Sequence, residues 1–271
     1  MKANKVITGI IGSVLGLLFL APFYIILTNS FKTKKELFMN TLSLPKGLNF
    51  DNYIKAWKEL DFIKVFFNSF LITLISIVVI IVFASMAAWM IQRTNNKIAN
   101  LILYMFIAAM LIPFQSVMLP LVRLMGNLHM LNIPGIIFMY LGFGSSLSIF
   151  LYHGFIKSIP RSLDEAATID GCNSLQTYIY VIFPILKPIS ITVALLNMVW
   201  IWNDYLLPSL TINNEETHTI PLRIFYFFGQ YTKQWHLALA GLTLSIIPVI
   251  IFYFFAQKQI IESVTAGSVK S

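Results

Sequence analysis

Residues 162–184, SLDEAATIDGCNSLQTYIYVIFP, form a polar stretch between two long apolar runs. Ser162 and Glu165 have the S-x-x-E spacing of a capping box, which predicts that a short helix over 163–170 begins here. Gly171 predicts a left-handed stop to that helix, because glycine adopts positive φ without steric cost. Ser174 predicts the cap of a second short helix that ends before Pro184. The stretch therefore predicts a rigid helix-turn-helix that projects from the apolar part of the chain.

The apolar runs around this stretch are long enough to cross a bilayer, which takes about 20 mostly apolar residues. Six of them are found, at 7–27, 65–91, 101–120, 133–155, 188–207 and 237–256. Prolines inside or beside these runs predict kinked spans, since neighbouring helices can satisfy the carbonyls that a proline frees. We therefore expect an all-α polytopic membrane protein with six transmembrane helices and both termini on one side.

Composition supports the membrane assignment. Of 271 residues, 58% are hydrophobic and 11% are charged, less than half the roughly 25% that is usual in soluble domains. The net charge of +8 comes from Lys and Arg scattered between apolar runs, so it does not indicate a nucleic-acid surface. The loops on the two sides of the six spans hold nine and ten Lys and Arg residues, so the positive-inside rule does not set the orientation.

Several kinds of chemistry find no support in the sequence. Cys172 is the single cysteine, which excludes an internal disulfide and a cysteine-based zinc cluster. The four histidines show no metal-binding spacing, so we expect no metal and no cofactor. A phosphate-binding G-x-x-x-x-G-K-[ST] loop is absent from the sequence, so any ATP-driven motor has to be another polypeptide.

The polar stretch resembles a known motif. Glu165-Ala166-Ala167, three residues, Gly171, nine residues and then 181–184 (VIFP) are similar to the EAA loop of ABC-importer permeases, EAA-x3-G-x9-I-x-L-P. Val and Phe replace Ile and Leu of that pattern, and both changes stay apolar. Further segments are similar to the carbohydrate branch of the family, the second permease of maltose-type importers: Asn52-Tyr53, Phe67-Asn68-Ser69, Trp202-Asn203-Asp204 and 265–270 (TAGSVK).

This resemblance implies the ABC transmembrane type-1 permease fold and a subunit without catalytic residues. Its organisation would be a first helix and outer loop over 1–64, a permease core over 65–257 with the coupling loop at 156–187, and a cytoplasmic tail over 258–271. In that family the EAA loop is cytoplasmic and docks on the ATPase, so both termini would lie inside. The residues implied to couple transport to the ATPase are Glu165, Ala166, Ala167, Asp170, Gly171 and Pro184.

The same resemblance implies partners and a location. The partners are a second permease in a heterodimer, two ATPase subunits, an extracytoplasmic solute-binding protein and a sugar, and the location is a bacterial or archaeal cell membrane. A permease for another solute class in the family is the main alternative. An ion-coupled secondary transporter is disfavoured because it would place several ionisable groups in its spans, where this chain places one acid, Asp204.

Four polar residues are candidates for the substrate path: Asn203, Asp204, Asn68 and Gln115. A carboxylate in hydrocarbon is costly, so Asp204 is expected to face a cavity or a partner. The alternative is that Asp204 caps a loop at the membrane interface, beside Trp202. For the amides of Asn68 and Gln115 we favour hydrogen bonds between helices over contacts with a sugar. The apolar segment 209–236 is expected either to cover the path and contact the binding protein or to lie on lipid.

Overall fold

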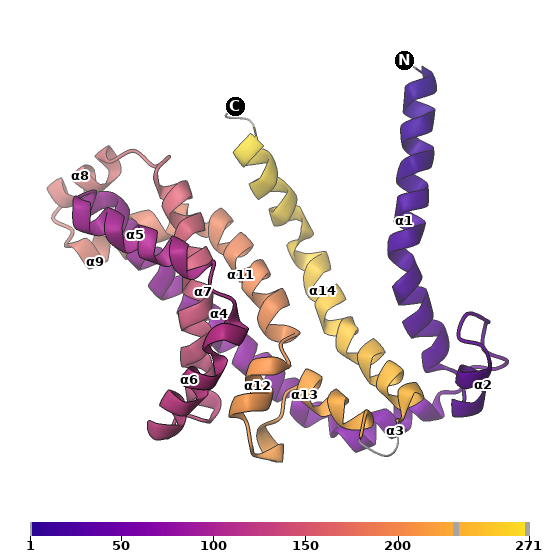
Figure 1. Ribbon diagram of the computed structural model, residues 1–271. Helices are drawn as coiled ribbons and strands as arrows, with labels where there is room; N and C mark the ends of the chain where they lie inside the picture. Colours follow the sequence, from indigo (N-terminus) through magenta and orange to yellow (C-terminus); the bar gives the residue numbers. More distant parts are fainter. Residues whose placement is uncertain (1, 230–232, 269–271) are drawn as a thin grey trace. The chain divides into compact units, whose positions relative to one another are not determined.

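The computed structural model describes residues 2–229 and 233–268, and they fold almost entirely as helices (Figure 1). The β-structure in this described part is one isolated bridge between Phe228 and Lys233. The predicted all-α fold is therefore confirmed. Three positions of the loop 209–236, residues 230–232, lie outside the described residues, as do residues 269 and 270 of the C-terminal motif and residue 271 of the predicted tail.

The structure has α-helices of very different lengths. They are α1 (Lys2–Ser30), α2 (Lys34–Met39), α3 (Asp51–Leu60), α4 (Phe62–Thr94), α5 (Lys97–Ala109), α6 (Phe114–Asn127), α7 (Ile133–Ile156), α8 (Ser162–Ile169), α9 (Ser174–Gln176), α10 (Phe183–Ile185), α11 (Lys187–Trp202), α12 (Leu206–Thr211), α13 (Ile220–Ile224) and α14 (Trp235–Ser268). A π-helix, η1 (Thr177–Ile182), joins α9 to α10, and η2 (Glu215–Thr217) and η3 (Phe225–Phe227) are 3-10 turns.

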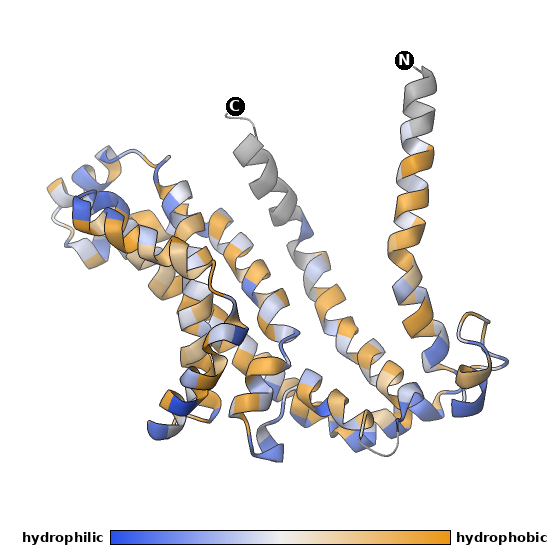
Figure 2. Ribbon diagram, viewed as in Figure 1, coloured by the Kyte–Doolittle hydropathy of each residue, from blue (hydrophilic) through white to orange (hydrophobic). Residues whose placement is uncertain are grey.

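Three helices are each long and apolar enough to cross a membrane as one unbroken element. In the described residues they are Thr8–Ser30, Phe62–Thr94 and Ile133–Ile156, and two bent helix pairs raise the number to as many as five. The sixth predicted run falls in α14, whose stretch Trp235–Ile251 is apolar but shorter. In Figure 2 hydrophobic colours follow the long helices and hydrophilic colours concentrate in the segments that connect them. The chain is thus a multi-pass membrane protein.

The predicted span at 101–120 is wrong as a single helix. The chain instead forms α5 and α6, which meet at a bend of 105°. Pro113 caps α6 in an extended conformation and has no N–H to continue the preceding helix. The residue before a proline also avoids the helical region, so the break at this point has a local cause.

The predicted span at 188–207 is also interrupted. Helix α11 ends at Trp202, and the chain turns through Asn203 and Asp204 before α12 begins. At its other end α11 meets the α9–η1–α10 segment at 77°, with Pro188 in its first turn. A proline there costs little, because the first turn of a helix has no carbonyl partner for its N–H groups.

The chain divides into two compact units. The first comprises residues 1–66 and 222–250, and the second comprises 67–221 and 251–271. In the first unit Gly241 of α14 lets Leu60 of α3 approach closely, since an added Cβ would lie 3.1 Å from the Leu60 Cδ1 atom. Both helices therefore pack against each other through small and buried side chains.

The second unit is built on α4, α7 and α11. Ile80, Ile149 and Val193 are among its buried apolar side chains. Gly144 of α7 allows this packing, because an added Cβ would lie 2.5 Å from the Ile80 Cδ1 atom and 2.7 Å from the Asn197 Oδ1 atom. Asn197 in turn donates to the Ser148 hydroxyl at 3.2 Å, so a buried hydrogen bond links α11 to α7.

Candidate functional site

Helix α8 occupies the first half of the predicted helix-turn-helix and spans Ser162–Ile169, within one residue of the predicted bounds. The predicted capping box is wrong: the N-cap residue is Arg161, and no side chain caps the helix. The amides of Asp164 and Glu165 both donate to the Arg161 carbonyl, at 2.9 and 3.2 Å. Ser162 is therefore already helical, and its hydroxyl is not in the cap position that the prediction required.

Gly171 ends α8 as predicted, with a φ of 87°. The Cys172 amide donates to the Ala167 carbonyl at 2.9 Å, and the Gly171 amide donates to the Thr168 carbonyl at 3.1 Å. These two bonds form a Schellman motif, which satisfies carbonyls that the end of a helix leaves without partners. The turn after α8 is therefore fixed by its own backbone.

The second half of the helix-turn-helix differs from the prediction. Asn173, and not Ser174, is the cap: its side chain accepts from the Gln176 amide, while the Gln176 side chain accepts from the Asn173 amide. The helix does not end before Pro184 but runs through the π-helix η1 into α10, where Pro184 lies in the first turn. The predicted end of this helix before Pro184 is therefore wrong.

The loop is held to the end of α4 by Asp164. One carboxylate oxygen pairs with the Arg93 guanidinium at 2.8 Å, and the other accepts from the Trp89 indole N–H at 2.8 Å. Arg93 also donates to the Ile159 carbonyl at 3.4 Å. Arg93 and Asp164 expose only 14% and 19% of their side chains, so water screens this ion pair less than a surface pair. The sequence does not predict the roles of Arg93 and Trp89, because they belong to a different helix and no local spacing pairs them with Asp164.

A second contact ties η1 to α4. The hydroxyls of Tyr178 and Ser85 lie 2.6 Å apart, and the Tyr178 ring lies 5.7 Å from the Trp89 ring between centroids. Tyr178 is buried, although its neighbour Tyr180 exposes 72% of its surface. Both halves of the helix-turn-helix therefore rest on α4, which leaves the other side of the loop free.

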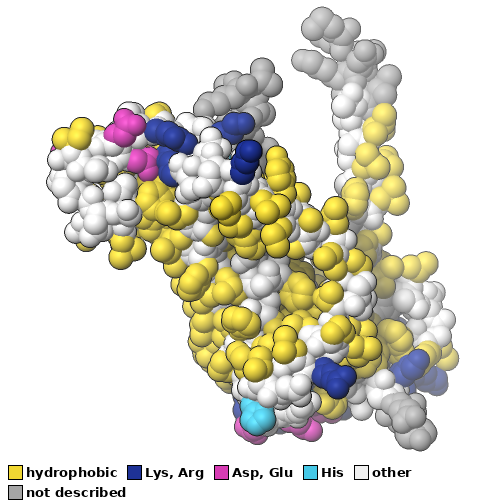
Figure 3. Space-filling view, turned by 60° about the vertical axis from the view of Figure 1, so that its left-hand side comes forward, with side chains coloured by type: hydrophobic (Ala, Val, Ile, Leu, Met, Phe, Trp, Pro, Cys, Tyr) yellow, Lys and Arg dark blue, Asp and Glu magenta, His cyan; other side chains and the backbone are white. Residues whose placement is uncertain are grey.

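The free side combines acidic and apolar groups. Glu165 is exposed, and Ile169, Leu175 and Tyr180 expose 86%, 56% and 72% of their surface. Of the other residues predicted to couple, Ala167 is buried, while Ala166, Asp170, Gly171 and Pro184 are exposed. A cleft of about 520 Å³ opens between this loop and α4, with Glu165 and Arg161 among its lining residues. In Figure 3 acidic and basic side chains lie side by side at the end of the molecule that carries this loop.

Asp204 lies between α11 and α12 and is half-buried. One of its oxygens accepts from the Tyr140 hydroxyl at 3.0 Å, and the other accepts from the amides of Leu206 and Leu207 at 2.9 and 3.4 Å. These contacts anchor the α11–α12 turn to α7 and give the first two amides of α12 a hydrogen-bond partner. Asn203 is exposed, and its amide donates to the Val199 carbonyl at 2.7 Å.

The other two path candidates, Asn68 and Gln115, lie in different environments. The Asn68 amide donates to the carbonyls of Glu216 and His218, at 2.9 and 3.0 Å, and so links α4 to the segment before α13. Gln115 is exposed in the first turn of α6. The Asn68 bonds join two segments of the chain, which is the role that we favour for this residue over contact with a sugar.

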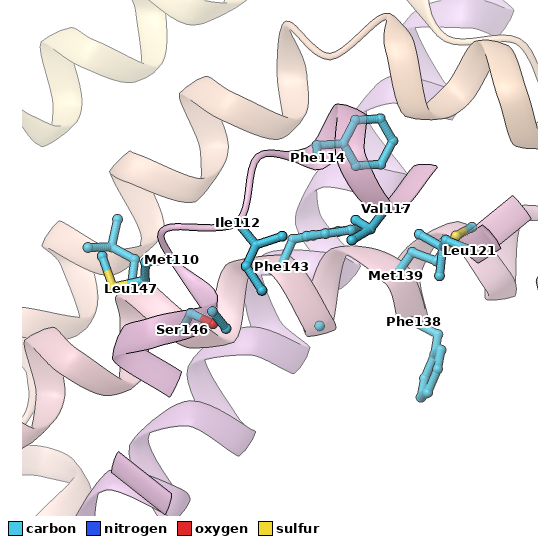
Figure 4. A pocket seen from close by; sticks show the side chains of 12 residues that line it. Met110, Ile112, Phe114, Val117, Leu121, Phe138, Met139, Phe143, Ser146 and Leu147 are labelled. Carbon is cyan, nitrogen blue, oxygen red and sulfur yellow. The ribbon is translucent and has the colours of Figure 1, made fainter. Parts of the chain in front are cut away.

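A cavity of about 580 Å³ lies where α5 and α6 bend away from each other, against α7. Figure 4 shows its lining side chains, among them Ile112, Phe114 and Phe143, with Ser146 as a hydroxyl at one side. None of the four predicted path residues lines it. The sequence does not predict this cavity, because the cavity depends on the size of the α5–α6 bend, which a hydropathy profile does not give.

Comparisons with known proteins place these features in a family. Residues 80–265 match the family model described as "Binding-protein-dependent transport system inner membrane component". A protein of Thermoanaerobacterium thermosulfurigenes, described as a probable permease (AmyC) of a transport system for starch degradation products, is 56% identical over 270 residues, which cover 100% of this chain and 98% of that protein.

Two further comparisons agree with this match. A multiple sugar-binding transport system permease of Streptococcus mutans (MsmG) is 36% identical over 94% of this chain and 93% of its own length. A chain in the crystal structure of a bacterial ABC transporter that imports the acidic polysaccharide alginate matches with a TM-score of 0.80, over 95% of this chain and 96% of that chain. At a sequence identity of 23%, the structural match shows a shared fold.

Proposed function

The chain belongs to the family of binding-protein-dependent transport system inner membrane components, and we propose that it forms the sugar pathway of an ATP-driven importer. It is a transport subunit and not an enzyme. The names of its relatives, which refer to starch degradation products and to multiple sugars, support a sugar or oligosaccharide as the cargo. Oligosaccharides from starch are the first substrates to test, and another solute class in the same family is the alternative.

The observation that carries the coupling proposal is the geometry of the α8–η1 loop. A Schellman turn at Gly171 and the Asp164 contacts with α4 make the loop stiff, while Glu165 and Ile169 stay exposed. A stiff element can transmit force from an ATPase to the helices that it rests on, whereas a flexible loop would absorb it. Glu165, Ala166, Ala167, Asp170, Gly171 and Pro184 form this coupling element in our proposal.

This role implies the orientation and the partners. The coupling loop faces an ATPase in the cytoplasm, so both termini lie inside and residues 28–64 lie outside. A second permease, two ATPase subunits and an extracytoplasmic binding protein complete the importer, in a bacterial or archaeal cell membrane. Residues 65–257 serve as the permease core, with 1–64 and 258–271 as additions to it.

The substrate path is a separate part of the proposal. Asp204 and Asn203 stand at the turn where α11 ends, and we assign them to the wall of the path. Asn68 and Gln115 are the other two candidates: the Asn68 amide is bonded to two carbonyls, and Gln115 is exposed in the first turn of α6. A carboxylate that anchors a turn through both oxygens can still present its edge to a sugar hydroxyl.

The experiment is uptake of radiolabelled malto-oligosaccharides into cells that express the complete importer. We expect uptake to stop with the ATPase poison vanadate and to survive a protonophore that collapses the proton gradient. Uptake that follows the proton gradient would contradict an ATP-driven mechanism. The same cells, supplied with other labelled solutes, identify the cargo: if no labelled sugar is taken up while a labelled amino acid or another solute is, the sugar assignment is overturned and the importer assignment stands.

A further inference from the structure

We propose that residues 33–48, which follow α1, form an anchor immersed in the interface of the membrane, with lysines that bind anionic lipid headgroups. The apolar part of α1 ends at Ser30, so this segment leaves the helix at the surface of the bilayer. We refer to residues 33–48 as the interfacial loop. In the orientation proposed above, the interfacial loop lies in the outer leaflet of the membrane. The immersion of the loop does not depend on that orientation.

The first observation is that the interfacial loop folds back along α1. The Tyr24 hydroxyl donates to the Leu42 carbonyl at 3.1 Å, and the Asn29 amide donates to the Thr41 carbonyl at 2.8 Å. Tyr24 lies six residues before the end of α1, which corresponds to about 9 Å along the helix axis. Figure 1 shows the chain after α2 rising beside the last turns of α1. Residues 41 and 42 therefore lie at the depth of an apolar span.

The second observation is that side chains bond the backbone of the irregular stretch 40–43. Lys32 is fully buried, and its ammonium group donates to the carbonyls of Asn40 and Thr41, at 2.9 and 3.3 Å. The Asn40 side chain accepts from the amides of Leu42 and Ser43, at 3.0 and 3.1 Å. A loop in water has no need of such internal partners, but non-helical backbone near hydrocarbon does, because each unpaired polar group there is costly.

The third observation is a set of apolar side chains that the interfacial loop exposes. Their exposed fractions are 64% for Phe38, 71% for Met39, 68% for Leu42, 70% for Leu44 and 66% for Leu48. In water so many neighbouring apolar groups would be unfavourable. The exposed apolar side chains of α1 continue this surface, so lipid is the medium that suits both.

The fourth observation is charge. Lys34, Lys35 and Lys46 are exposed, and Glu36 is the acid in the same segment, which leaves the interfacial loop with a net charge of 3 − 1 = +2. Glu36 is engaged in the capping box with Thr33, which begins α2. Lysines beside an apolar surface at the edge of a span are typical of contact with anionic headgroups.

Site-specific fluorescence tests the immersion. The full chain, in its assembled complex and with Cys172→Ser, carries one new cysteine labelled with an environment-sensitive dye, either Leu42→Cys or Leu44→Cys. Asn213→Cys, an exposed position in a different segment, is the matched control. The measurements are made in vesicles of phosphatidylcholine and phosphatidylglycerol. We expect a lipid that carries a quencher near its headgroup to quench a dye at position 42 or 44 several-fold more than a dye at position 213. We expect iodide in the water to quench the dye at position 213 more than the other two.

Two results would overturn the immersion. One is iodide quenching at 42 and 44 equal to that at 213, with little effect of the lipid quencher. The other is that the dyes become protected only when a solute-binding protein is added, which would make the loop a protein-docking surface. Neither readout uses transport, so a chain that fails to import sugar can still confirm the anchor.

The lysines have their own test in the same vesicles. Lys34→Gln, Lys35→Gln and Lys46→Gln in one chain remove the charge and keep most of the side-chain length. We expect a quencher attached to phosphatidylglycerol to act several-fold less on dye 42 in this variant, while a quencher attached to phosphatidylcholine acts as before. Equal quenching by labelled phosphatidylglycerol in both chains would show that the lysines do not recognise anionic lipid.

Discussion

Gly171 holds a left-handed backbone conformation at the end of α8, with open space where a Cβ atom would lie. A substitution there acts through backbone strain alone, since no neighbour is displaced. The strain for a residue with a Cβ atom is about 1–2 kcal/mol and is greatest for β-branched side chains, whereas asparagine tolerates this region better. Gly171 therefore allows strain to be introduced into the backbone of the coupling loop without displacing a neighbouring side chain.

We expect Gly171→Val to lower sugar uptake per assembled complex more than Gly171→Ala, and Gly171→Asn to lower it least. The measurement is the initial rate of uptake, corrected for the amount of complex in the membrane. Gly154→Val is the control, because an added Cβ at Gly154 also meets open space, but its φ is ordinary. Uptake at the normal rate in Gly171→Val, at normal abundance, would remove the turn from the coupling mechanism.

Asp204 allows a second test at the scale of single residues. Asp204→Leu removes all three hydrogen bonds of the carboxylate, whereas Asp204→Asn can keep an oxygen acceptor for the Leu206 amide. If the carboxylate also binds a sugar, the loss of one charge-assisted bond weakens binding roughly 10- to 100-fold. We expect leucine to raise the half-saturating sugar concentration more than asparagine does, at saturating binding protein.

Tyr140→Phe separates anchoring from sugar binding, since it removes one anchor of Asp204 and leaves the carboxylate in place. We expect it to lower the thermal stability of the complex with a smaller change in half-saturation. If half-saturation is unchanged in both Asp204 variants while the abundance of the complex falls, the residue only anchors the turn.

At the scale of elements, the ion pair between Arg93 and Asp164 joins α8 to α4. We expect Arg93→Met to destabilise the complex, because it leaves a poorly solvated carboxylate without its cation. Asp164→Leu in the same chain should restore part of the loss. A double-mutant cycle on thermal unfolding of the purified complex gives the coupling energy, which we expect at about 0.5–3 kcal/mol for residues in direct contact. Additive effects of the two single substitutions would show that the pair does not hold the loop.

The same elements show what the sequence could predict. The bounds of α8 and the left-handed Gly171 depend on neighbours a few residues away, and both predictions are confirmed. The predicted cap of α8 is wrong, because the helix already includes Ser162 and no side chain caps its start, although the S-x-x-E spacing is present. The sequence predicts kinks at Pro113 and Pro188 but not the size of the bends, because the angle of a bend depends on the helices packed around it.

At the scale of the whole molecule, hydropathy and one motif were sufficient for the fold class and the family. They were insufficient for the contacts between distant segments, such as those of Asp204 with Tyr140 and of Asn68 with the segment before α13. Such contacts leave no periodic signal, because each involves one polar residue in an apolar helix. The cavity beside the α5–α6 bend has the same origin.

We propose that the exposed side of the α8–η1 loop docks on a separate ATPase. The most direct test of this docking is crosslinking from Ile169→Cys, in a Cys172→Ser chain that carries a short photoreactive label, within the assembled importer. Ile169 is the most exposed large apolar residue of the loop, and Asn213→Cys is an exposed control in a different segment. We predict a crosslink to the ATPase subunit from position 169 and none from position 213. Labelling of lipid or of the binding protein from position 169, with no ATPase captured, would contradict the claim.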